Sequence, residues 1–227
     1  MRYAVLSDIH GNLEALKAVL KRLDSEDVTS YISLGDIVGY GADPSECIRL
    51  LRSLKLSASV AGNHDWGVAG TFDLGGFNDH ARAAILWTRK ILGSLELEYL
   101  KSLPLVHVGE NFSLVHGSLE KPKEFIYILT KSDAAASVKL MTTPVLFVGH
   151  SHMACVYNFE GGNKCVVNAG SVGQPRDGDP RASFVIYDDR TGNIKTIRVD
   201  YDIERARKKI LDAGLPAFLG DRLRKGV

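Results

Sequence analysis

Short apolar runs alternate with helical patterns along the first part of the chain. Residues 3–7, 31–34 and 57–61 are mainly apolar and of strand length, and after the first of them apolar side chains recur at helical spacing, at Leu13, Leu16, Val19, Leu20 and Leu23. The sequence Asp43-Pro44-Ser45-Glu46 predicts a second helix start, with a capping aspartate, a proline at the first helical position and a glutamate at the third. This alternation predicts a parallel sheet covered by helices.

The rest of the chain combines a helical middle with further strands. Helices are predicted at 78–103, 132–140 and 203–213. Strands are predicted at 106–108, 112–115 and 145–148, followed by an antiparallel meander of the segments 154–159, 164–168, 183–187 and 194–199. The residues after Gly220 are predicted to fray. Because no linker or repeat divides the chain, we predict one α/β domain with two sheets over residues 1–227.

Composition narrows the class of protein. The 227 residues are 45% hydrophobic, enough for a full core, and a formal net charge of +1 gives no general attraction for nucleic acids or anionic membranes. No apolar run approaches the ~18 residues of a membrane span, and no signal-peptide pattern is visible. Cys47, Cys155 and Cys165 favour small core side chains in a reducing compartment, although a hairpin could place Cys155 opposite Cys165. We predict a cytoplasmic protein whose oligomeric state the sequence does not indicate.

Polar motifs follow five of the predicted strands. They are Asp8-Ile9-His10, Gly35-Asp36, Gly62-Asn63-His64-Asp65, His116-Gly117 and Gly149-His150-Ser151-His152. Sites in α/β folds form beyond the carboxyl ends of strands. Side chains two positions apart on extended backbone point to the same side, so Asp8 with His10 is predicted to serve one metal, as is His150 with His152. Imidazole, carboxylate and amide ligands without thiolate suit Mn, Fe, Zn, Ni or Co. The motifs predict a site for two divalent metal ions.

The five motifs, in this order, resemble those of the calcineurin-like metallophosphoesterase family. The single-domain bacterial and archaeal phosphodiesterases are the most similar branch, and residues 168–176, Asn-Ala-Gly-Ser-Val-Gly-Gln-Pro-Arg, resemble its glycine-rich C-terminal signature. The resemblance implies two mixed β-sheets packed as a sandwich and flanked by helices, a four-layer α/β/β/α fold. It also implies that residues 1–227 form one such domain without a separate cap domain.

The resemblance also implies roles for individual residues. One metal ion would be held by Asp8, His10, Asp36 and His152, and the other by Asp36, Asn63, His116 and His150. A hydroxide bridging the two metals would attack phosphorus in line. His64 would then be the general acid for the leaving oxygen, with Asp65 as its partner in catalysis. Manganese is the metal expected to support activity in vitro.

Two further residues are candidate substrate contacts with open alternatives. Asn12 follows His10 closely, yet it stands where a helix N-cap is expected. Arg176 could place its guanidinium on the phosphate, or it could pair with Asp177 or Asp179 at the surface. His80 and His107 lie outside every motif, so no site role is predicted for them.

The leading functional hypothesis is a dinuclear-metal-dependent phosphoesterase, most simply a phosphodiesterase, acting on a small phosphoester. Phosphoprotein phosphatases of the family carry Gly-Asp-x-Val-Asp-Arg-Gly, whereas this chain has Gly39 and Tyr40 in place of the second aspartate and the arginine. That difference disfavours a phosphoprotein phosphatase and a dinucleoside-tetraphosphatase-like enzyme, and it leaves open what positions His64. A non-catalytic scaffold on the same fold is the remaining alternative.

Overall fold

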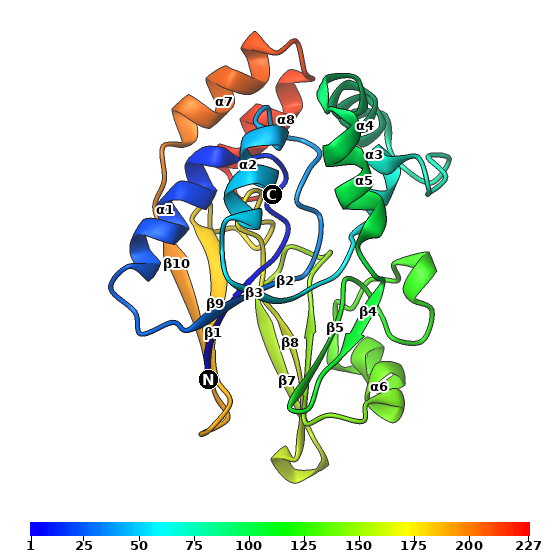
Figure 1. The fold of residues 1–227 in the computed structure, drawn as a ribbon, viewed down its shortest axis with the longest axis vertical. Coiled ribbons are helices and arrows are strands. Elements are labelled where there is room, and N and C mark those ends of the chain that lie inside the picture. Colours follow the sequence, from blue (N-terminus) through cyan, green and yellow to red (C-terminus); the bar gives the residue numbers. More distant parts are fainter.

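The computed structural model describes the backbone of residues 1–227 and every side chain except that of Glu160. Five strands form the first sheet, in the order β10-β9-β1-β2-β3 (Figure 1). Strands β1, β2 and β3 run parallel as predicted, and β9 and β10 are antiparallel additions. The bounds of these strands are β1 Arg2–Leu6, β2 Ser30–Ser33, β3 Leu56–Ser59, β9 Ala182–Asp188 and β10 Asn193–Val199.

The second sheet also has five strands, in the order β4-β5-β6-β8-β7. Its central pairs β5–β6 and β6–β8 are parallel and its outer pairs are antiparallel, so both sheets are mixed. The strands are β4 Val106–Val108, β5 Phe112–Val115, β6 Val145–Val148, β7 Cys155–Phe159 and β8 Lys164–Asn168. The predicted single meander is therefore wrong, because its two hairpins lie in different sheets.

Helices cover the outer faces of the two sheets (Figure 1). In the first sheet, Ala4 and Leu6 of β1 pack toward α1 and α2, whereas Tyr3 and Val5 pack against the other sheet, as strand alternation requires. In the second sheet, Val148 packs toward α6. The layers are thus helix, sheet, sheet and helix, as predicted. The helices are α1 Leu13–Leu23, α2 Pro44–Arg52, α3 Asn63–Ala69, α4 Asp79–Ile91, α5 Ser94–Ser102, α6 Lys131–Leu140, α7 Ile203–Asp212 and α8 Ala217–Asp221, with short 3₁₀ turns at Pro122–Glu124, Glu160–Gly162 and Arg222–Arg224.

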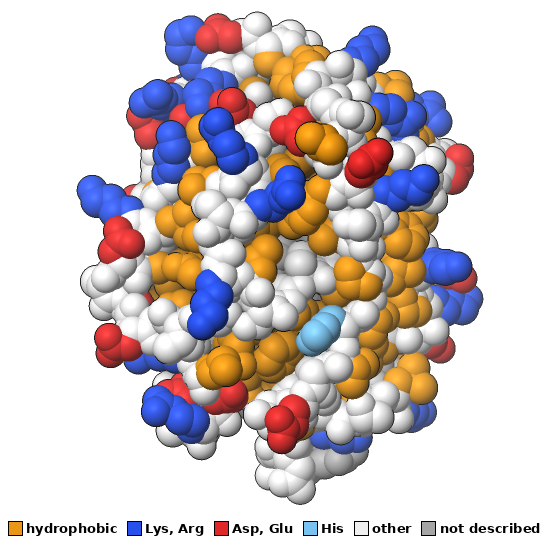
Figure 2. Space-filling view, in the orientation of Figure 1, with side chains coloured by type: hydrophobic (Ala, Val, Ile, Leu, Met, Phe, Trp, Pro, Cys, Tyr) orange, Lys and Arg blue, Asp and Glu red, His pale blue; other side chains and the backbone are white. Residues whose placement is uncertain are grey.

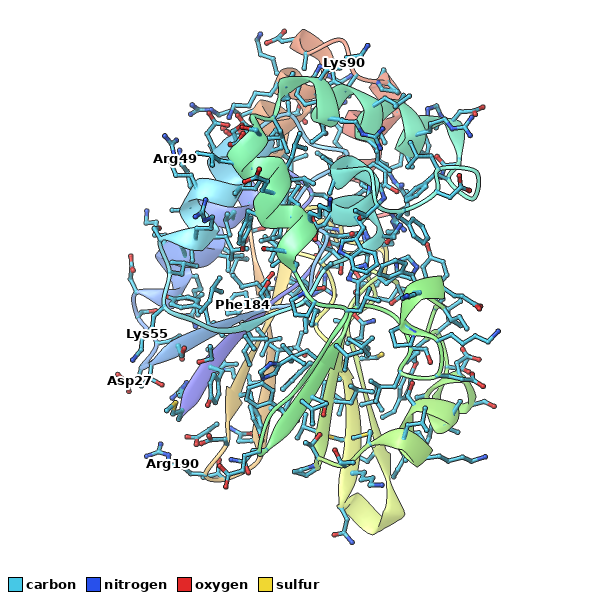
Figure 3. The ribbon with its side chains drawn as sticks, turned by 45° about the vertical axis from the view of Figure 1, so that its right-hand side comes forward. Asp27, Arg49, Lys55, Lys90, Phe184 and Arg190 are labelled. Atoms are coloured by element: carbon cyan, nitrogen blue, oxygen red, sulfur yellow. The ribbon has the colours of Figure 1, made fainter. Side chains whose placement is uncertain are left out.

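Apolar and charged side chains separate as this layering demands. Figure 3 shows Phe184 inside the molecule on β9, whereas labelled charged side chains such as Lys90 and Arg190 point outward. Phe184 is fully buried. Figure 2 shows acidic and basic side chains interspersed over one face, in keeping with the near-zero net charge. None of the helices described is long and apolar enough to cross a membrane.

Two local predictions need correction. The segment after Gly220 is not frayed, because Leu223 is buried in a cluster with residues of α4 and α7. Asp43 stands at the N-cap of α2 but makes no capping hydrogen bond with its side chain, and its carboxylate accepts instead from Lys209 Nζ at 2.9 Å. The disfavoured alternative of Cys155 opposite Cys165 is not seen, since Cys155 pairs in register with Asn168 and both thiols are free.

Candidate metal centre

The predicted ligands come from strand ends of both sheets and meet at one edge of the sandwich. Asp8 and His10 follow β1, Asp36 follows β2, and Asn63 is the first residue of α3. The remaining ligands follow strands of the second sheet: His116 follows β5, and His150 and His152 follow β6. Except for Asn63, which is half-buried, all of these side chains are buried. Carboxyl ends of strands from both sheets therefore assemble the site.

The side chains form groups that could each hold a cation. The ligand atoms of Asp8, His10 and His152 all lie within 4.8 Å of one another. Those of Asp36, His116 and His150 form a second group by the same measure, and those of His10, Asp36 and His64 form a third. The first two groups each contain three of the four ligands that the family resemblance implies for one metal ion.

Each carboxylate has one oxygen held by hydrogen bonds and one oxygen directed at imidazoles. Asp36 Oδ1 accepts from the backbone N–H of His64 at 2.8 Å, while its Oδ2 lies 3.6 Å from His10 Nε2 and 3.3 Å from His116 Nε2. Asp8 Oδ2 accepts from Ser7 Oγ at 2.5 Å, and Asp8 Oδ1 lies 3.2 Å from His152 Nε2. Asp36 Oδ2 thus lies near histidines of both of the first two groups, and Asp8 Oδ1 does so at a longer distance, 3.8 Å, from His116 Nε2.

Backbone carbonyl groups orient three of the imidazoles. The Nδ1 atoms of His10, His116 and His152 lie 3.1, 2.7 and 2.5 Å from the carbonyl oxygens of Val38, Leu34 and Gln174, respectively. A carbonyl oxygen can only accept, so Nδ1 carries a proton, and in the neutral ring Nε2 is the nitrogen with a lone pair for a metal. Hydrogen bonds of this kind fix the tautomer that a metal ligand needs.

The two buried carboxylates favour positive charge beside them, and the donor set fits divalent metal ions. His10 Nε2 and His152 Nε2 lie only 3.1 Å apart, and Asp8 Oδ1, Asn63 Oδ1 and His116 Nε2 are buried without a hydrogen-bond partner. Burial would lower the pKa of His116, yet the carboxylates of Asp36 and Asp8 raise it to about 9. Unpaired buried polar atoms are costly, and a cation at each group would satisfy them.

Strained backbone places these ligands, contrary to the extended conformation assumed from the sequence. Asp8, His10 and Asp36 have φ values of 52°, 50° and 51°, and His150 and His152 have φ values of 66° and 60°. Non-glycine residues adopt this left-handed region infrequently and at a cost. The side chains of His150 and His152 enter different groups, as the assignment implied by the family resemblance has them, rather than facing one position.

His64 and Asp65 are adjacent in sequence, but their side chains lie in different surroundings. His64 faces the cavity beside the metal groups, and burial lowers its pKa to about 4, against the opposing effect of Asp36. Asp65 accepts from the backbone N–H groups of Ile37 at 2.9 Å and Gly62 at 3.1 Å. The predicted catalytic partnership of Asp65 with His64 is therefore not supported, and Asp65 fixes the loop after β2 instead.

Packing, rather than a carboxylate, holds the His64 ring. Its centroid lies 4.4 Å from that of Tyr40 and 5.1 Å from that of Phe77. Gly39, at φ 90°, lies so close that an added Cβ would collide with His64 Nδ1. Gly39 and Tyr40 replace the aspartate and arginine of the phosphoprotein phosphatases, and here they form a close-packed wall for the ring.

Gly39→Ala should lower turnover by about 10²-fold while both metal sites stay filled. The new methyl group would displace the His64 ring, and if His64 is the general acid that the family resemblance implies, misplacing it by about 1 Å can cost that much. Steady-state kinetics together with metal analysis of the purified variant would check this. Gly192→Ala is the matched control, because Gly192 has a similar φ of 70° with nothing within 4 Å of an added Cβ. Equal loss of turnover in both variants would show that backbone strain alone is responsible.

The two candidate substrate contacts have different surroundings. Asn12 caps α1, with its Oδ1 accepting from Ala15 N at 3.1 Å and its Nδ2 donating to the carbonyl of Gly173 at 2.8 Å. Its side chain is thus committed to structure, and the substrate-contact alternative is not supported. Arg176 lines the cavity, and its Nε is buried without a partner.

The surface ion pairs considered for Arg176 are made by other arginines. Asp177 pairs with Arg198, and Asp179 pairs with Arg181. The guanidinium of Arg176 instead donates to Gln174 Oε1 at 2.9 Å and lies over the Tyr40 ring. Of the two alternatives for Arg176, the surface ion pair is not made, and the side chain lines the cavity.

A cavity of about 520 Å³ opens beside the candidate metal ligands, and the roles of its individual aromatic residues were not predicted from the sequence. Five aromatic side chains line it: Tyr40, Phe72, Phe77, Phe125 and Tyr127. The Tyr127 ring stacks on His150 at a centroid distance of 3.9 Å. These residues belong to no recognisable motif, and the one available signal was the concentration of aromatic residues in two loops.

This chain is similar to known proteins over nearly its whole length. Residues 1–192 match the calcineurin-like phosphoesterase superfamily domain. An uncharacterised protein of Methanocaldococcus jannaschii is 42% identical over 238 aligned positions, which cover 97% of this chain and 96% of that protein.

Two solved structures are similar to this chain over its full length. A metallophosphoesterase from Sphaerobacter thermophilus is 40% identical with a TM-score of 0.87, and the match covers 100% of this chain and 99% of that one. A hypothetical protein from Pyrococcus horikoshii OT3 is 27% identical with a TM-score of 0.88, over 100% of this chain and 98% of that one. The similarity therefore includes both sheets and the strand ends that carry the metal groups.

Proposed function

The chain belongs to the calcineurin-like phosphoesterase superfamily and is a phosphoric ester hydrolase, and from this premise we propose that it cleaves phosphodiesters with two divalent metal ions bound. The observation that carries the proposal is the pair of Asp/His groups with Asp36 Oδ2 between them. We propose Asp8, His10, Asp36 and His152 for one ion, and Asp36, Asn63, His116 and His150 for the other. When bound, the two ions would supply charge neutralisation and an activated water nucleophile. Manganese should serve in vitro, and Fe, Zn, Ni and Co fit the same donors.

The size of the cavity supports a diester over a monoester. About 520 Å³ beside the two candidate metal sites leaves space for a second ester arm. The bound ions would supply most of the positive charge that receives the phosphate, and among the described residues that line the cavity Arg176 alone adds a side chain that is cationic at every physiological pH.

Two residues of the chain would assist the reaction besides the metal ligands, one by binding phosphate and one by holding a proton. Arg176 can bind a non-bridging phosphoryl oxygen, because its Nε has no protein partner. His64 lies where it can hold a proton for the leaving oxygen. An anionic phosphate beside the ring would raise the pKa of His64 from its lowered value, since a negative charge stabilises the imidazolium.

Arg176→Met should raise KM for a phosphodiester by about 10- to 100-fold, with a smaller effect on kcat. Hydrogen bonds to charged groups contribute about 1.5–3 kcal/mol, and this contact is made in the bound ground state as well as in the transition state. Full steady-state kinetics would measure the two parameters. Arg181→Met is the control, because Arg181 is exposed and paired with Asp179. An unchanged KM in Arg176→Met would remove Arg176 from the substrate site.

The substrate class can be tested with one panel. The metal-loaded protein should hydrolyse bis-p-nitrophenyl phosphate with a higher kcat/KM than p-nitrophenyl phosphate. A preference for the monoester would favour a phosphatase. Exclusive cleavage of a dinucleoside tetraphosphate would favour a dinucleoside-tetraphosphatase-like enzyme. Metal-loaded protein without activity on any phosphoester would support the scaffold alternative.

A further inference from the structure

Two loops build an aromatic wall next to the metal groups. Phe72 and Phe77 belong to the segment between α3 and α4, whereas Phe125 and Tyr127 belong to the segment between β5 and α6. Figure 1 shows both segments on the same side of the molecule, and all four side chains line the one cavity that also contains His150 and Arg176. The aromatic wall, defined as these four side chains, thus adjoins the place where the phosphate would be bound.

Three of the four rings of the aromatic wall remain accessible, whereas Phe125 is buried. Phe72 and Phe77 are only half-buried, and Tyr127 is 46% exposed. Phe72 meets Phe77 at a centroid distance of 6.0 Å and an interplanar angle of 87°, and it meets Phe125 at 5.1 Å and 88°. Edge-to-face contacts of this kind leave Phe72 without a face-to-face stacking partner among the wall residues.

Aromatic rings that lie beside a polar reaction centre favour a ligand with a planar apolar group next to its phosphate. Burying planar apolar surface against these rings is favourable, and nucleic-acid bases stack on aromatic side chains. A non-planar ester arm such as glycerol would leave most of the aromatic surface exposed to water. A cavity of about 520 Å³ is large enough for a nucleoside monophosphate-sized ligand, within the range of small-molecule sites.

We propose that the aromatic wall is a nucleobase subsite, so that one arm of the phosphodiester substrate is a nucleoside. This inference rests on the proposed function, in that the phosphate must sit at the metal groups for the base to reach the wall. Phe72 is the specificity-determining residue that this subsite predicts. Phe77 also packs on His64 and Tyr127 also stacks on His150, so substitutions there would disturb other parts of the site.

The first test isolates the base in a binding measurement that needs no turnover. Adenosine 5′-monophosphate and ribose 5-phosphate differ in the base alone, and isothermal titration calorimetry of the manganese-loaded full chain would give both affinities. The nucleotide should bind about 5- to 100-fold more tightly, the range expected for stacking one base on aromatic side chains. Phe72→Leu should remove most of that ratio and Phe72→Tyr should restore it. Equal affinities for the two ligands would overturn the subsite.

The second test asks whether the wall selects substrates. The p-nitrophenyl ester of thymidine 5′-monophosphate and ethyl p-nitrophenyl phosphate release the same leaving group and differ in the other arm. The wild type should favour the nucleoside ester in kcat/KM, and Phe72→Leu should lower this preference through KM while sparing the ethyl ester. Phe218→Leu is the matched control, because Phe218 is exposed on α8 and stacks on His80 outside the cavity.

The outcomes separate this inference from the proposed function. Hydrolysis of neither ester would contradict the phosphodiesterase proposal, and the binding ratio would still decide the subsite. Hydrolysis of both esters at equal kcat/KM would retain the phosphodiesterase and overturn the subsite. A nucleoside preference that persists unchanged in Phe72→Leu would place base recognition elsewhere and overturn the assignment of the wall.

Discussion

Asp36→Asn should abolish phosphoester hydrolysis and prevent the protein from retaining two metal ions. Asp36 Oδ2 faces His10 Nε2 and His116 Nε2, one from each group, so its charge serves both ions. Losing the shared carboxylate removes several kcal/mol of charge stabilisation, and we expect activity to fall by at least about 10³-fold. Inductively coupled plasma mass spectrometry of the dialysed variant would measure bound metal alongside the rate.

The fold should survive this change. The amide oxygen of an asparagine can still accept the hydrogen bond that Asp36 Oδ1 takes from the His64 backbone. Asp202→Asn is a suitable control, since Asp202 caps α7 and asparagine caps equally well. If Asp36→Asn kept two metal ions per chain, Asp36 would not be the shared ligand.

His64→Ala should retain both metal ions and slow turnover by about 10²–10⁴-fold, the usual contribution of general acid catalysis. The loss should be greatest for diesters with poor leaving groups, which need a proton most. A series of aryl diesters of graded leaving-group pKa would measure this, and the variant should show the steeper dependence.

His64 is also close enough to His10 and Asp36 to act as a ligand, so metal content is the deciding control. Loss of an ion from His64→Ala would make His64 a ligand, and a uniform rate loss across the series would remove its role as acid. His107→Ala should change neither metal content nor rate, because His107 lies on β4 beside Phe112, away from the site.

The convergence of the candidate metal ligands could be predicted from sequence because these residues follow strand ends. Each motif follows an apolar run, and the parallel arrangement of β1 and β2 brings Asp8 and Asp36 to the same edge. The α/β/β/α layering followed from the same pattern, through its resemblance to a known family. Helices α1 and α2 were equally evident, since their apolar spacing and polar starts agree.

What could not be predicted depends on tertiary contacts. The left-handed backbone at His150 and His152 is imposed by the surrounding structure, and no local sequence preference reveals it. Asp65 pairs with the backbone of Ile37, whose proximity requires the assembled β2 and α3. Likewise, the aromatic wall comes from two loops that are distant in sequence and meet only in the folded chain.

The strand pairing of the C-terminal half shows the same limit. The sequence identifies β7 with β8 and β9 with β10 as hairpins, because a short turn joins each pair. It does not reveal which sheet each hairpin joins. Val185 and Tyr187 of β9 pack in the core between the sheets, while Phe184 packs toward the helices, so burial on both faces decides that placement.

The most direct test of two-metal phosphodiester hydrolysis is a manganese titration of chelator-stripped protein. Bound metal and the hydrolysis of bis-p-nitrophenyl phosphate would be measured on the same samples. We expect no turnover without metal, and turnover that saturates as two Mn²⁺ ions bind per chain. Turnover that persists in excess chelator, or a chain that binds two Mn²⁺ ions and hydrolyses neither this diester nor its monoester, would contradict the account.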